Sequence, residues 1–375
     1  MMANLGFGSA LLMISVVLSV CPAGAIQDAA SAGDQSKEYS SRGSEGELQS
    51  AIALTRRGQF ATAIPHFLAV RGAVKEQYAA NFNLALCYIG IAHYKEAIPV
   101  LTELQNTGHD NADVDNLLAQ AYVGDSQPAA ALTALHKAVE LTPTNEKLYI
   151  FVADACTDHQ SYALGLKVVD IGLEHLPLSA RLHYERAMFL SALDQFDLAK
   201  VDFDLVQRLA SNSAIADLAS AQKFLYAGEI DGAVRASREG LKKDNNDVRL
   251  LTVFGDALIR SGISADQPEF SEARSSLEKA VAERPRFAGS HIALGKLYLL
   301  ENHLTDAIAQ LELARQLDAG DPSVYANLAK AYERSGKPDE AKAALATLAK
   351  LNQAQAEKIS SAPGDRKVSY GQVAH

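Results

Sequence analysis

Clusters of basic residues are missing from this sequence, and their absence excludes one large class of partners. The 375 residues contain 35 Lys and Arg against 45 Asp and Glu, which gives a formal net charge of −10 at pH 7. Proteins that bind nucleic acid neutralise backbone phosphates with lysine and arginine gathered on one face. An acidic chain without a basic block is therefore not expected to bind DNA or RNA.

Motifs for catalysis, metals and cofactors are missing too. The ten histidines are scattered, and no pair has the i, i+4 spacing with an adjacent glutamate that forms a helical zinc site. No Gly-x-Ser-x-Gly elbow and no phosphate-binding loop is present. His183 and Glu185 are close in sequence but point to different faces of a helix. We therefore predict that the protein is not an enzyme and has no catalytic residue, metal site or cofactor.

Cysteine is scarce and tryptophan is absent. The three cysteines are Cys21, Cys87 and Cys156, which are too few for a disulfide framework, and we expect Cys87 and Cys156 to be free and buried. Alanine and leucine recur instead. Both lose little side-chain freedom in a helix, so the composition favours helices over strands.

The N-terminus has the pattern of an export signal. Leu5–Val20 is an apolar run of 16 residues, shorter than the roughly 20 needed to span a bilayer. It lacks a preceding Lys or Arg, but Ala23-Gly24-Ala25 follows it and suits a signal peptidase. We predict a signal peptide over residues 1–25 and export to the periplasm or exterior of a bacterium, with no membrane span in the mature chain.

Two alternatives to a cleaved, freely diffusing protein stay open. Leu18-Ser19-Val20-Cys21 is similar to a lipoprotein box, so Cys21 could carry a lipid and associate the protein with the outer membrane. A cytoplasmic adaptor that keeps its N-terminus is the other alternative.

Beyond the N-terminus, small residues recur every 34 positions. Two parallel series keep one register, and both resume after a single six-residue insertion. The first is Ala63, Ala97, Ala131, Gly165, Ala199, Ala233, Ala273, Ala307 and Ala341; the second is Ala51, Ala85, Ala119, Ala153, Ala187, Ala221, Gly255, Gly295 and Ala329. A fixed period of this length indicates a stack of helical repeats, with small residues where paired helices approach closely.

The pattern resembles the tetratricopeptide repeat, a pair of antiparallel helices in about 34 residues. Its clearest unit is 112–145, which contains Leu118-Ala119, Tyr122, Ala131 and Pro143. The resemblance implies an all-α protein, a right-handed α-solenoid of tandem helix-turn-helix repeats. The nine predicted units are 44–77, 78–111, 112–145, 146–179, 180–213, 214–247, 248–287, 288–321 and 322–355.

Three segments fall outside the repeat pattern. Residues 26–43 are polar and are predicted to be a disordered linker. Residues 356–375 are predicted to form a short cap and a disordered tail. The insertion at 263–268 is interpreted either as a tolerated surface loop or as a lip over one edge of the groove.

The resemblance also implies a binding surface. In such solenoids the first helix of each unit lines a concave face, where family members commonly hold peptide segments. In units two to five the inward positions are Phe82, Asn83, Leu86, Ile89, Asn116, Gln120, Val123, Ile150, Asp154, Arg181 and Tyr184. In units six to nine they are Leu218, Gln222, Tyr226, Arg249, Asp256, Arg260, Lys296, Asn327, Lys330 and Arg334.

We take the first set as the candidate groove, because apolar strips rimmed by polar groups mark interaction surfaces. Two questions stay open. Phe82 and Leu86 could instead pack between helices. In unit nine, Asn327, Lys330 and Arg334 share one helix face and could receive an acidic group, or could form a solvated charged face.

The sequence thus predicts an exported, non-catalytic scaffold or adaptor that binds peptide segments or other proteins in its concave groove, in cell-envelope assembly or secretion. Alternatives are a lipid-anchored assembly factor and an accessory subunit that regulates a separately encoded enzyme. The repeat pattern specifies neither the partner nor the oligomeric state, because function is added to such a scaffold by its surface residues.

Overall fold

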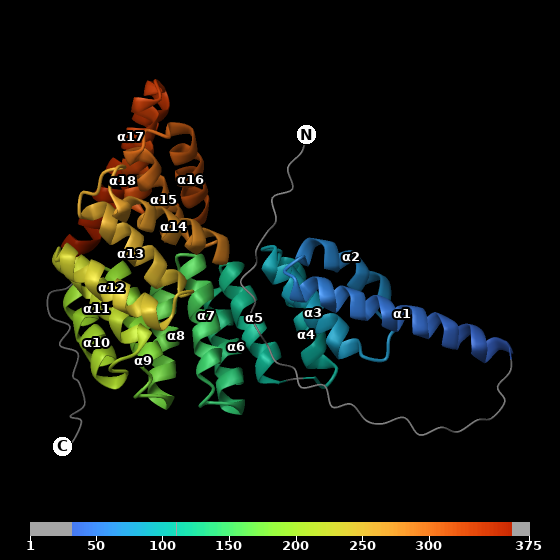
Figure 1. Ribbon diagram of the computed structural model, residues 1–375. Coiled ribbons are helices and arrows are strands. Elements are labelled where there is room, and N and C mark those ends of the chain that lie inside the picture. The colour runs from blue at the N-terminus through green and yellow to red at the C-terminus, as the bar shows by residue number, and fades with distance from the viewer. Residues whose placement is uncertain (1–31, 110, 362–375) are drawn as a thin grey trace, which may run out of the picture.

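The computed structural model of the chain describes secondary structure for residues 32–109 and 111–361 and side chains for residues 43–109 and 111–354. Eighteen helices and no strand occur in the described residues (Figure 1). The helix bounds are α1 Ala32–Arg56, α2 Phe60–Val70, α3 Gln77–Gly90, α4 Tyr94–Asn106, α5 Ala112–Gly124, α6 Pro128–Leu141, α7 Glu146–Asp158, α8 Tyr162–His175, α9 Ala180–Ala192, α10 Phe196–Leu209, α11 Ala214–Ala227, α12 Ile230–Lys243, α13 Val248–Arg260, α14 Pro268–Glu283, α15 Ala288–Leu300, α16 Leu304–Leu317, α17 Pro322–Arg334 and α18 Pro338–Ser361.

These helices confirm the predicted all-α solenoid of tandem helix-turn-helix repeats, with two helices in each predicted unit. The N-terminal end differs from the prediction, because helix α1 begins at Ala32, inside the segment predicted to be a linker. At the other end α18 continues to Ser361, through the residues predicted to form a short cap. A helix that is already nucleated extends at little cost through polar residues, which the composition argument overlooked. The predicted signal peptide, Cys21 and residues 362–375 lie outside the described residues.

Small residues lie where the helices approach most closely, as predicted. Ala63, Ala97 and Ala131 are fully or almost fully buried. A Cβ atom added at Gly165 would lie 2.4 Å from the Phe189 ring. No side chain fits at that distance, so the glycine is required by the packing of α8 against α9.

The turn between the two helices of a unit has one recurring conformation. In the eight units without the insertion, the residue two before the second helix has a positive φ, as in Gly58 (φ 70°) and Gly336 (φ 73°). This left-handed residue closes the preceding helix, and its N–H bonds back to that helix. Glycine adopts the conformation freely, but five units use other residues there: Ala92, Ser126, Gln160, Asp194 and Asn302.

A second repeated bond fixes the connection between units. The Tyr149 hydroxyl donates to the Pro143 carbonyl oxygen at 2.7 Å, and Tyr325 bonds Ala319 in the same way at 3.0 Å. At the same register position, His183 Nε2 lies 3.0 Å from the Pro177 carbonyl oxygen and His291 Nε2 lies 2.8 Å from that of Pro285. The carbonyl left free where one unit ends is thus satisfied by the first helix of the next.

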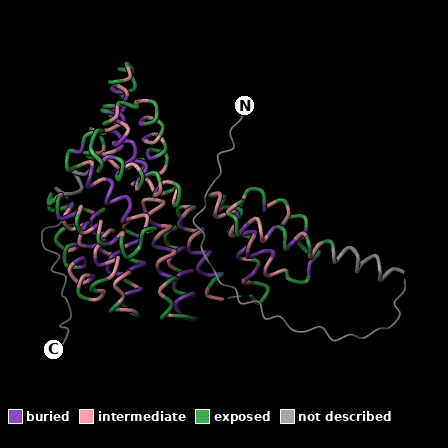
Figure 2. The backbone as a smooth tube through the Cα atoms, in the orientation of Figure 1, coloured by how far each residue is buried: buried purple, intermediate pink, exposed green. Residues whose placement is uncertain are grey.

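The core extends along the array. Four hydrophobic clusters of buried residues follow one another from unit one to unit nine, and Figure 2 shows buried stretches along nearly every helix pair. Each unit is therefore stabilised mainly by its neighbours, as expected for a solenoid.

The six-residue insertion lies between α13 and α14. Ile263 is buried beside Phe254, Leu258 and Phe270, while residues 264–267 are exposed. The insertion is thus a surface loop held to the core by one side chain.

The array also curves back on itself. In Figure 1 the orange helices α14–α16 lie beside the green helices α7 and α8. The Gln160 side chain after α7 donates to the Leu317 carbonyl oxygen at the end of α16 at 3.1 Å, which shows that units four and eight touch.

Candidate interaction surfaces on the concave face

Several of the predicted groove residues belong to the helix-packing core. Phe82, Val123 and Tyr184 are at most 6% exposed and pack within the hydrophobic clusters. These positions face the axis of the superhelix, but the first helices of adjacent units stack closely enough to cover them. For Phe82, the interpretation as an inter-helix residue is therefore the right one.

The amide side chains of units two and three are engaged by the protein itself. Asn116 Nδ2 donates to the Leu148 carbonyl oxygen at 2.7 Å, and Gln120 Nε2 donates to Asn116 Oδ1 at 2.8 Å. Asn83 Nδ2 donates to the Ala79 carbonyl oxygen at 2.8 Å. Asn83 and Asn116 thus already use part of their hydrogen-bonding capacity within the protein.

Three predicted groove residues take part in an internal ion-pair cluster. Arg249 of α13 reaches back to Glu185 Oε1 of α9 at 2.5 Å and to Asp154 Oδ1 of α7 at 3.1 Å. Arg181 lies 2.8 Å from the same Glu185 oxygen, and the Arg249 guanidinium lies over the Tyr184 ring. Asp154, Arg181 and Tyr184 thus hold units four, five and seven together.

Burial and charge act against each other in this cluster. Burial alone would lower the pKa of Arg249, but Glu185 and Asp154 outweigh it and raise the pKa above the ordinary arginine value. Arg249 therefore stays cationic, and removing it would leave the buried Glu185 carboxylate with less compensation.

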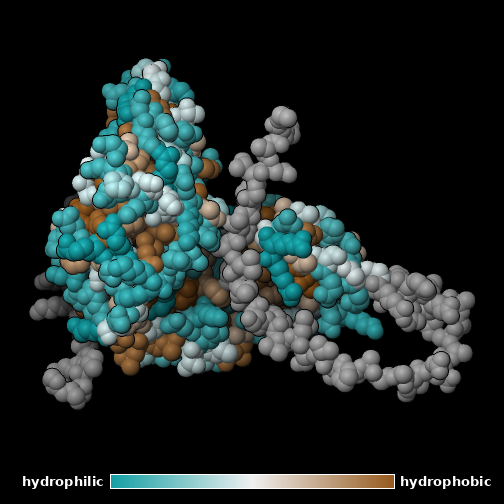
Figure 3. Space-filling model, in the orientation of Figure 1, coloured by the Kyte–Doolittle hydropathy of each residue, from teal (hydrophilic) through white to brown (hydrophobic). Residues whose placement is uncertain are grey.

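The remaining predicted groove residues are half-buried. Leu86, Ile89 and Ile150 pack against the core of units two to four with part of their surface exposed. Leu86 and Ile89 lie on α3 and Ile150 lies on α7. The face of the molecule in Figure 3 likewise shows hydrophobic atoms in scattered patches on a mostly hydrophilic surface.

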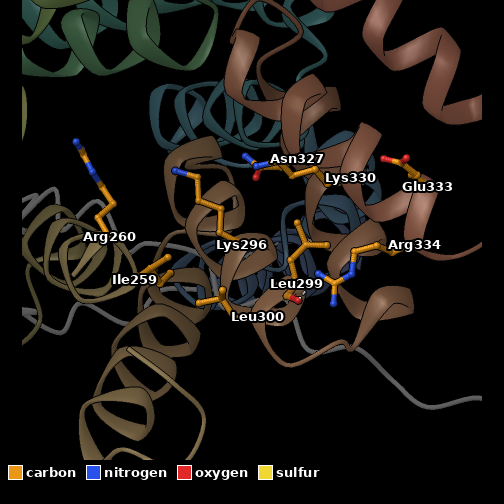
Figure 4. Close-up of a pocket in the computed structure, with 9 residues that line it drawn as sticks. All are labelled: Ile259, Arg260, Lys296, Leu299, Leu300, Asn327, Lys330, Glu333 and Arg334. Atoms are coloured by element: carbon orange, nitrogen blue, oxygen red, sulfur yellow. Dashed lines mark hydrogen bonds between the residues drawn. The ribbon is translucent and has the colours of Figure 1, made fainter. Parts of the chain in front are cut away.

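A separate hollow of about 570 Å³ lies on the first helices of units seven to nine (Figure 4). Its lining residues come from α13, α15 and α17, so it is part of the concave face. They are Ile259, Arg260, Lys296, Leu299, Leu300, Asn327, Lys330, Glu333 and Arg334.

The hollow has a positive balance of charge. Four cations line it, Arg260, Lys296, Lys330 and Arg334, against Glu333 in the lining and Asp256, which pairs with Lys296 and more distantly with Arg260. Since the whole chain has a net charge of −10, this is a local reversal of sign. Such a reversal attracts an acidic partner.

Two of these cations have little or no compensating charge. Among the described residues Lys330 makes no ion pair, and Arg334 donates to the neutral Leu299 carbonyl and Asn302 amide oxygens at 2.7 and 2.8 Å. Lys296 does pair with Asp256, at 3.0 Å. Arg334 is thus held in place by bonds that leave its charge available to a ligand.

The sequence contained a signal for this hollow. Arg260 and Arg334 occupy one register position and Lys296 and Lys330 another, so the cations align across units. The first set of inward residues was preferred as the groove because it is apolar. Where the first helices of adjacent units stack on each other, however, an apolar residue more often belongs to the hydrophobic core than to an exposed surface.

Reactive groups are not assembled elsewhere in the described part of the chain. Cys87 and Cys156 are free and buried, as predicted, and burial raises the pKa of their thiols to about 11 and about 12. His183 bonds the buried Asp202, whereas Glu185 bonds Arg249, so the two do not act as a pair. Among the described residues no group of His, Cys, Asp and Glu could hold a metal ion. No described helix is long and apolar enough to cross a membrane.

The array of paired helices defines this chain as a helical-repeat solenoid, and comparison with known proteins specifies the repeat. The tetratricopeptide repeat family matches residues 54–121, 265–326 and 301–361. The TPR repeat-containing protein YpiA of Bacillus subtilis (strain 168) is 25% identical over 256 residues, which cover 66% of this chain and 57% of YpiA. The chain thus spans little more than half the length of that relative.

Solved structures of repeat proteins are also similar to this chain. The thermophilic TPR protein TTC0263 of Thermus thermophilus is 22% identical, with a TM-score of 0.40 over 48% of this chain and all of that one. The Cut9–Hcn1 hetero-tetramer of the APC/C is 15% identical, with a TM-score of 0.48 over 76% of this chain and 59% of that one. The family matches show tetratricopeptide repeats in these segments, and the rest of the described array repeats the same pairs of helices. Tetratricopeptide-repeat proteins are generally non-catalytic scaffolds that bind other proteins.

Proposed function

We propose that this protein is an exported scaffold that binds acidic segments of other proteins in the hollow of units seven to nine, as part of cell-envelope assembly or secretion. The observation that supports this most strongly is the row of aligned cations, Arg260, Lys296, Lys330 and Arg334, on the concave face of an acidic chain.

The chemistry of the hollow suggests what such a segment contains. Ile259, Leu299 and Leu300 provide apolar contact, and 52% of Leu300 is exposed. The cations flank these side chains on α13, α15 and α17 (Figure 4). An apolar side chain flanked by aspartate or glutamate matches this arrangement, with apolar contact supplying affinity and charge supplying register.

A peptide titration tests this site. The probe is a fluorescein-labelled peptide in which Asp and Glu flank a leucine, compared with the same peptide carrying Asn and Gln. We expect the acidic peptide to bind, and the variant Lys296→Glu with Lys330→Glu to bind it at least about a hundredfold more weakly. The matched control is Lys137→Glu with Lys167→Glu, which changes net charge equally on the second helices α6 and α8. Equal loss in both variants would show a general charge effect and would reject the hollow as the site.

Export is proposed from the sequence pattern of residues 1–25. Mass spectrometry of the protein from its native cell separates the alternatives. A chain that begins at Ile26 supports a cleaved signal peptide, a lipid-modified Cys21 supports an anchored assembly factor, and an intact Met1 contradicts export.

A further inference from the structure

The curvature of the solenoid brings two distant parts of the concave side into contact. Arg284, just after α14, lies 3.1 Å from Asp158 Oδ1 and 3.4 Å from Asp154 Oδ1 on α7. Beside this contact, Tyr162 donates to Asp318 Oδ2 at 3.0 Å and Gln160 donates to the Leu317 carbonyl oxygen at 3.1 Å. We call these residues the latch, since they connect unit four to units seven and eight.

In the latch, a basic segment of the chain pairs with carboxylates of another unit, as a basic ligand would. Asp154 and Asp158 are one turn apart on α7, so their carboxylates share one face of the helix. The connection from α14 to α15 carries Arg284 and Arg286, whose positive charges act on Asp158 against the burial that raises its pKa. A basic loop of the chain thus covers an acidic surface of unit four.

The charged contacts of the latch are weak compared with the Arg249 cluster. The side chains of Arg284, Asp158 and Asp154 are 21%, 25% and 29% exposed, so water and salt screen their attraction. Burial of Asp158 raises its pKa despite the attraction of Arg284, which means that desolvation exceeds the ion-pair gain. Ion pairs that stay partly exposed to solvent contribute little, on the order of 1 kcal/mol each.

The latch is also separate from the contacts that fold the array. Each unit of a solenoid packs on its neighbours, and four successive hydrophobic clusters provide that packing here. Contacts between units four and eight add to this packing without replacing it. They can therefore open while every helix pair stays folded.

We propose that the latch is a salt-sensitive intramolecular contact that hides a second interaction surface. When Arg284 leaves, unit eight separates from unit four, and Asp158 becomes available to an arginine-containing segment of a partner, while Asp154 stays paired with Arg249. This surface is distinct from the cationic hollow and takes ligands of opposite charge, so it does not depend on the function proposed above.

Two measurements on the full chain test the proposal, the radius of gyration from small-angle X-ray scattering and the binding of a fluorescein-labelled peptide of alternating arginine and glycine. Three variants are compared with the natural protein: Arg284→Ala, Asp158→Asn, and the control Arg315→Ala, whose arginine pairs with Glu312 on its own helix. Circular dichroism checks that each variant is folded.

We expect the radius of gyration of the natural protein to increase when the salt concentration is raised from about 50 mM to about 0.5 M. The Arg284→Ala variant should have the larger radius at both salt concentrations. At low salt Arg284→Ala should bind the basic peptide roughly tenfold more tightly than the natural protein, because the competing internal arginine is gone. The Asp158→Asn variant should have an expanded radius of gyration, because it removes the partner of Arg284, and it should not bind the basic peptide. If the Arg284→Ala variant has the same radius of gyration as the natural protein, the latch does not hold units four and eight together. If the variant expands but does not bind the basic peptide more tightly, unit four is not an interaction surface.

Discussion

The two ends of the concave face use the same repeat positions for different purposes. In units two and three these positions hold Leu86 and Gln120, which pack against the core or bond a neighbouring side chain. In units eight and nine they hold Lys296 and Lys330, which line an open hollow. Register in a tandem repeat therefore determines where a side chain lies, while the residue and its neighbours determine whether it is available to a partner.

The middle of the concave face separates these two regions. Arg249, Glu185 and Asp154 connect units four, five and seven, and Arg284 adds a further contact across the same space. A single polypeptide could not lie along the whole inner surface without displacing these ion pairs. The concave face thus consists of separate surfaces of different charge.

The largest expected effect is on stability, when one apolar residue of the N-terminal part of the concave face is compared with one of the hollow. Phe82→Ala should lower the free energy of unfolding by about 3–5 kcal/mol, because it removes a ring that is only 6% exposed. Leu300→Ala should change it by less than about 0.5 kcal/mol, since most of that side chain faces solvent. Urea denaturation followed by circular dichroism measures both. Similar losses for the two variants would mean that Phe82 and Leu300 are not in different environments.

The next effect concerns the arginines of the central cluster and the hollow. Arg249→Ala leaves the buried Glu185 carboxylate paired with Arg181 alone, and we expect a loss of about 3 kcal/mol in unfolding free energy. Arg260→Ala, in the same helix but at the exposed edge of the hollow, should change stability by less than about 0.5 kcal/mol. The same urea experiment applies, and a loss below about 1 kcal/mol for Arg249→Ala would show that the cluster does not support the array.

A smaller effect compares one register position in the two regions. Lys330→Ala should weaken binding of the acidic peptide by about fivefold, or about 1 kcal/mol, because it removes one uncompensated charge. Gln120→Ala, at the equivalent position of unit three, should leave the affinity unchanged. Fluorescence anisotropy measures both constants, and weaker binding by the Gln120 variant would place the peptide on the N-terminal surface instead.

The smallest effect concerns pH at the contact between the regions. Burial raises the pKa of Asp318 above its ordinary value of 3.8. A carboxyl whose pKa is raised by folding stabilises the folded state below its unfolded pKa, and that contribution is lost as pH rises through the folded pKa. Asp318→Asn cannot ionise, so its stability relative to the natural protein should improve by less than about 1 kcal/mol between about pH 4 and pH 7. Urea denaturation across that range measures the difference, and a constant difference would contradict this account.

Much of the fold was predictable because its determinants recur in sequence. The two small-residue series indicate where helices approach, and at Gly165 and Gly295 even a Cβ atom would lie only 2.4 and 2.6 Å from a neighbouring side chain. The turn conformation was less visible, since Ala92 and Ser126 adopt a positive φ without glycine as a marker. The start of α1 at Ala32 was missed because its polar residues are common to linkers and to exposed helices.

The candidate site was less predictable, because exposure depends on contacts that no repeat pattern encodes. Arg249 and Asp154 are 95 residues apart, and their pairing follows from the curvature of the whole array. Phe82 differs from an exposed inward residue only through the stacking of its neighbours. The cations of the hollow were identified as inward residues, but their shared opening became evident only in three dimensions.

Photo-crosslinking tests most directly where a partner binds. The probe is the acidic peptide with a photoreactive group at its leucine position, and mass spectrometry of the digested full-length protein locates the attachment. Crosslinks within residues 256–334 are the result predicted here, with loss of the signal in the variant Lys296→Glu with Lys330→Glu. Crosslinks within residues 82–123 that survive this double substitution would contradict the assignment and return the site to the apolar N-terminal surface.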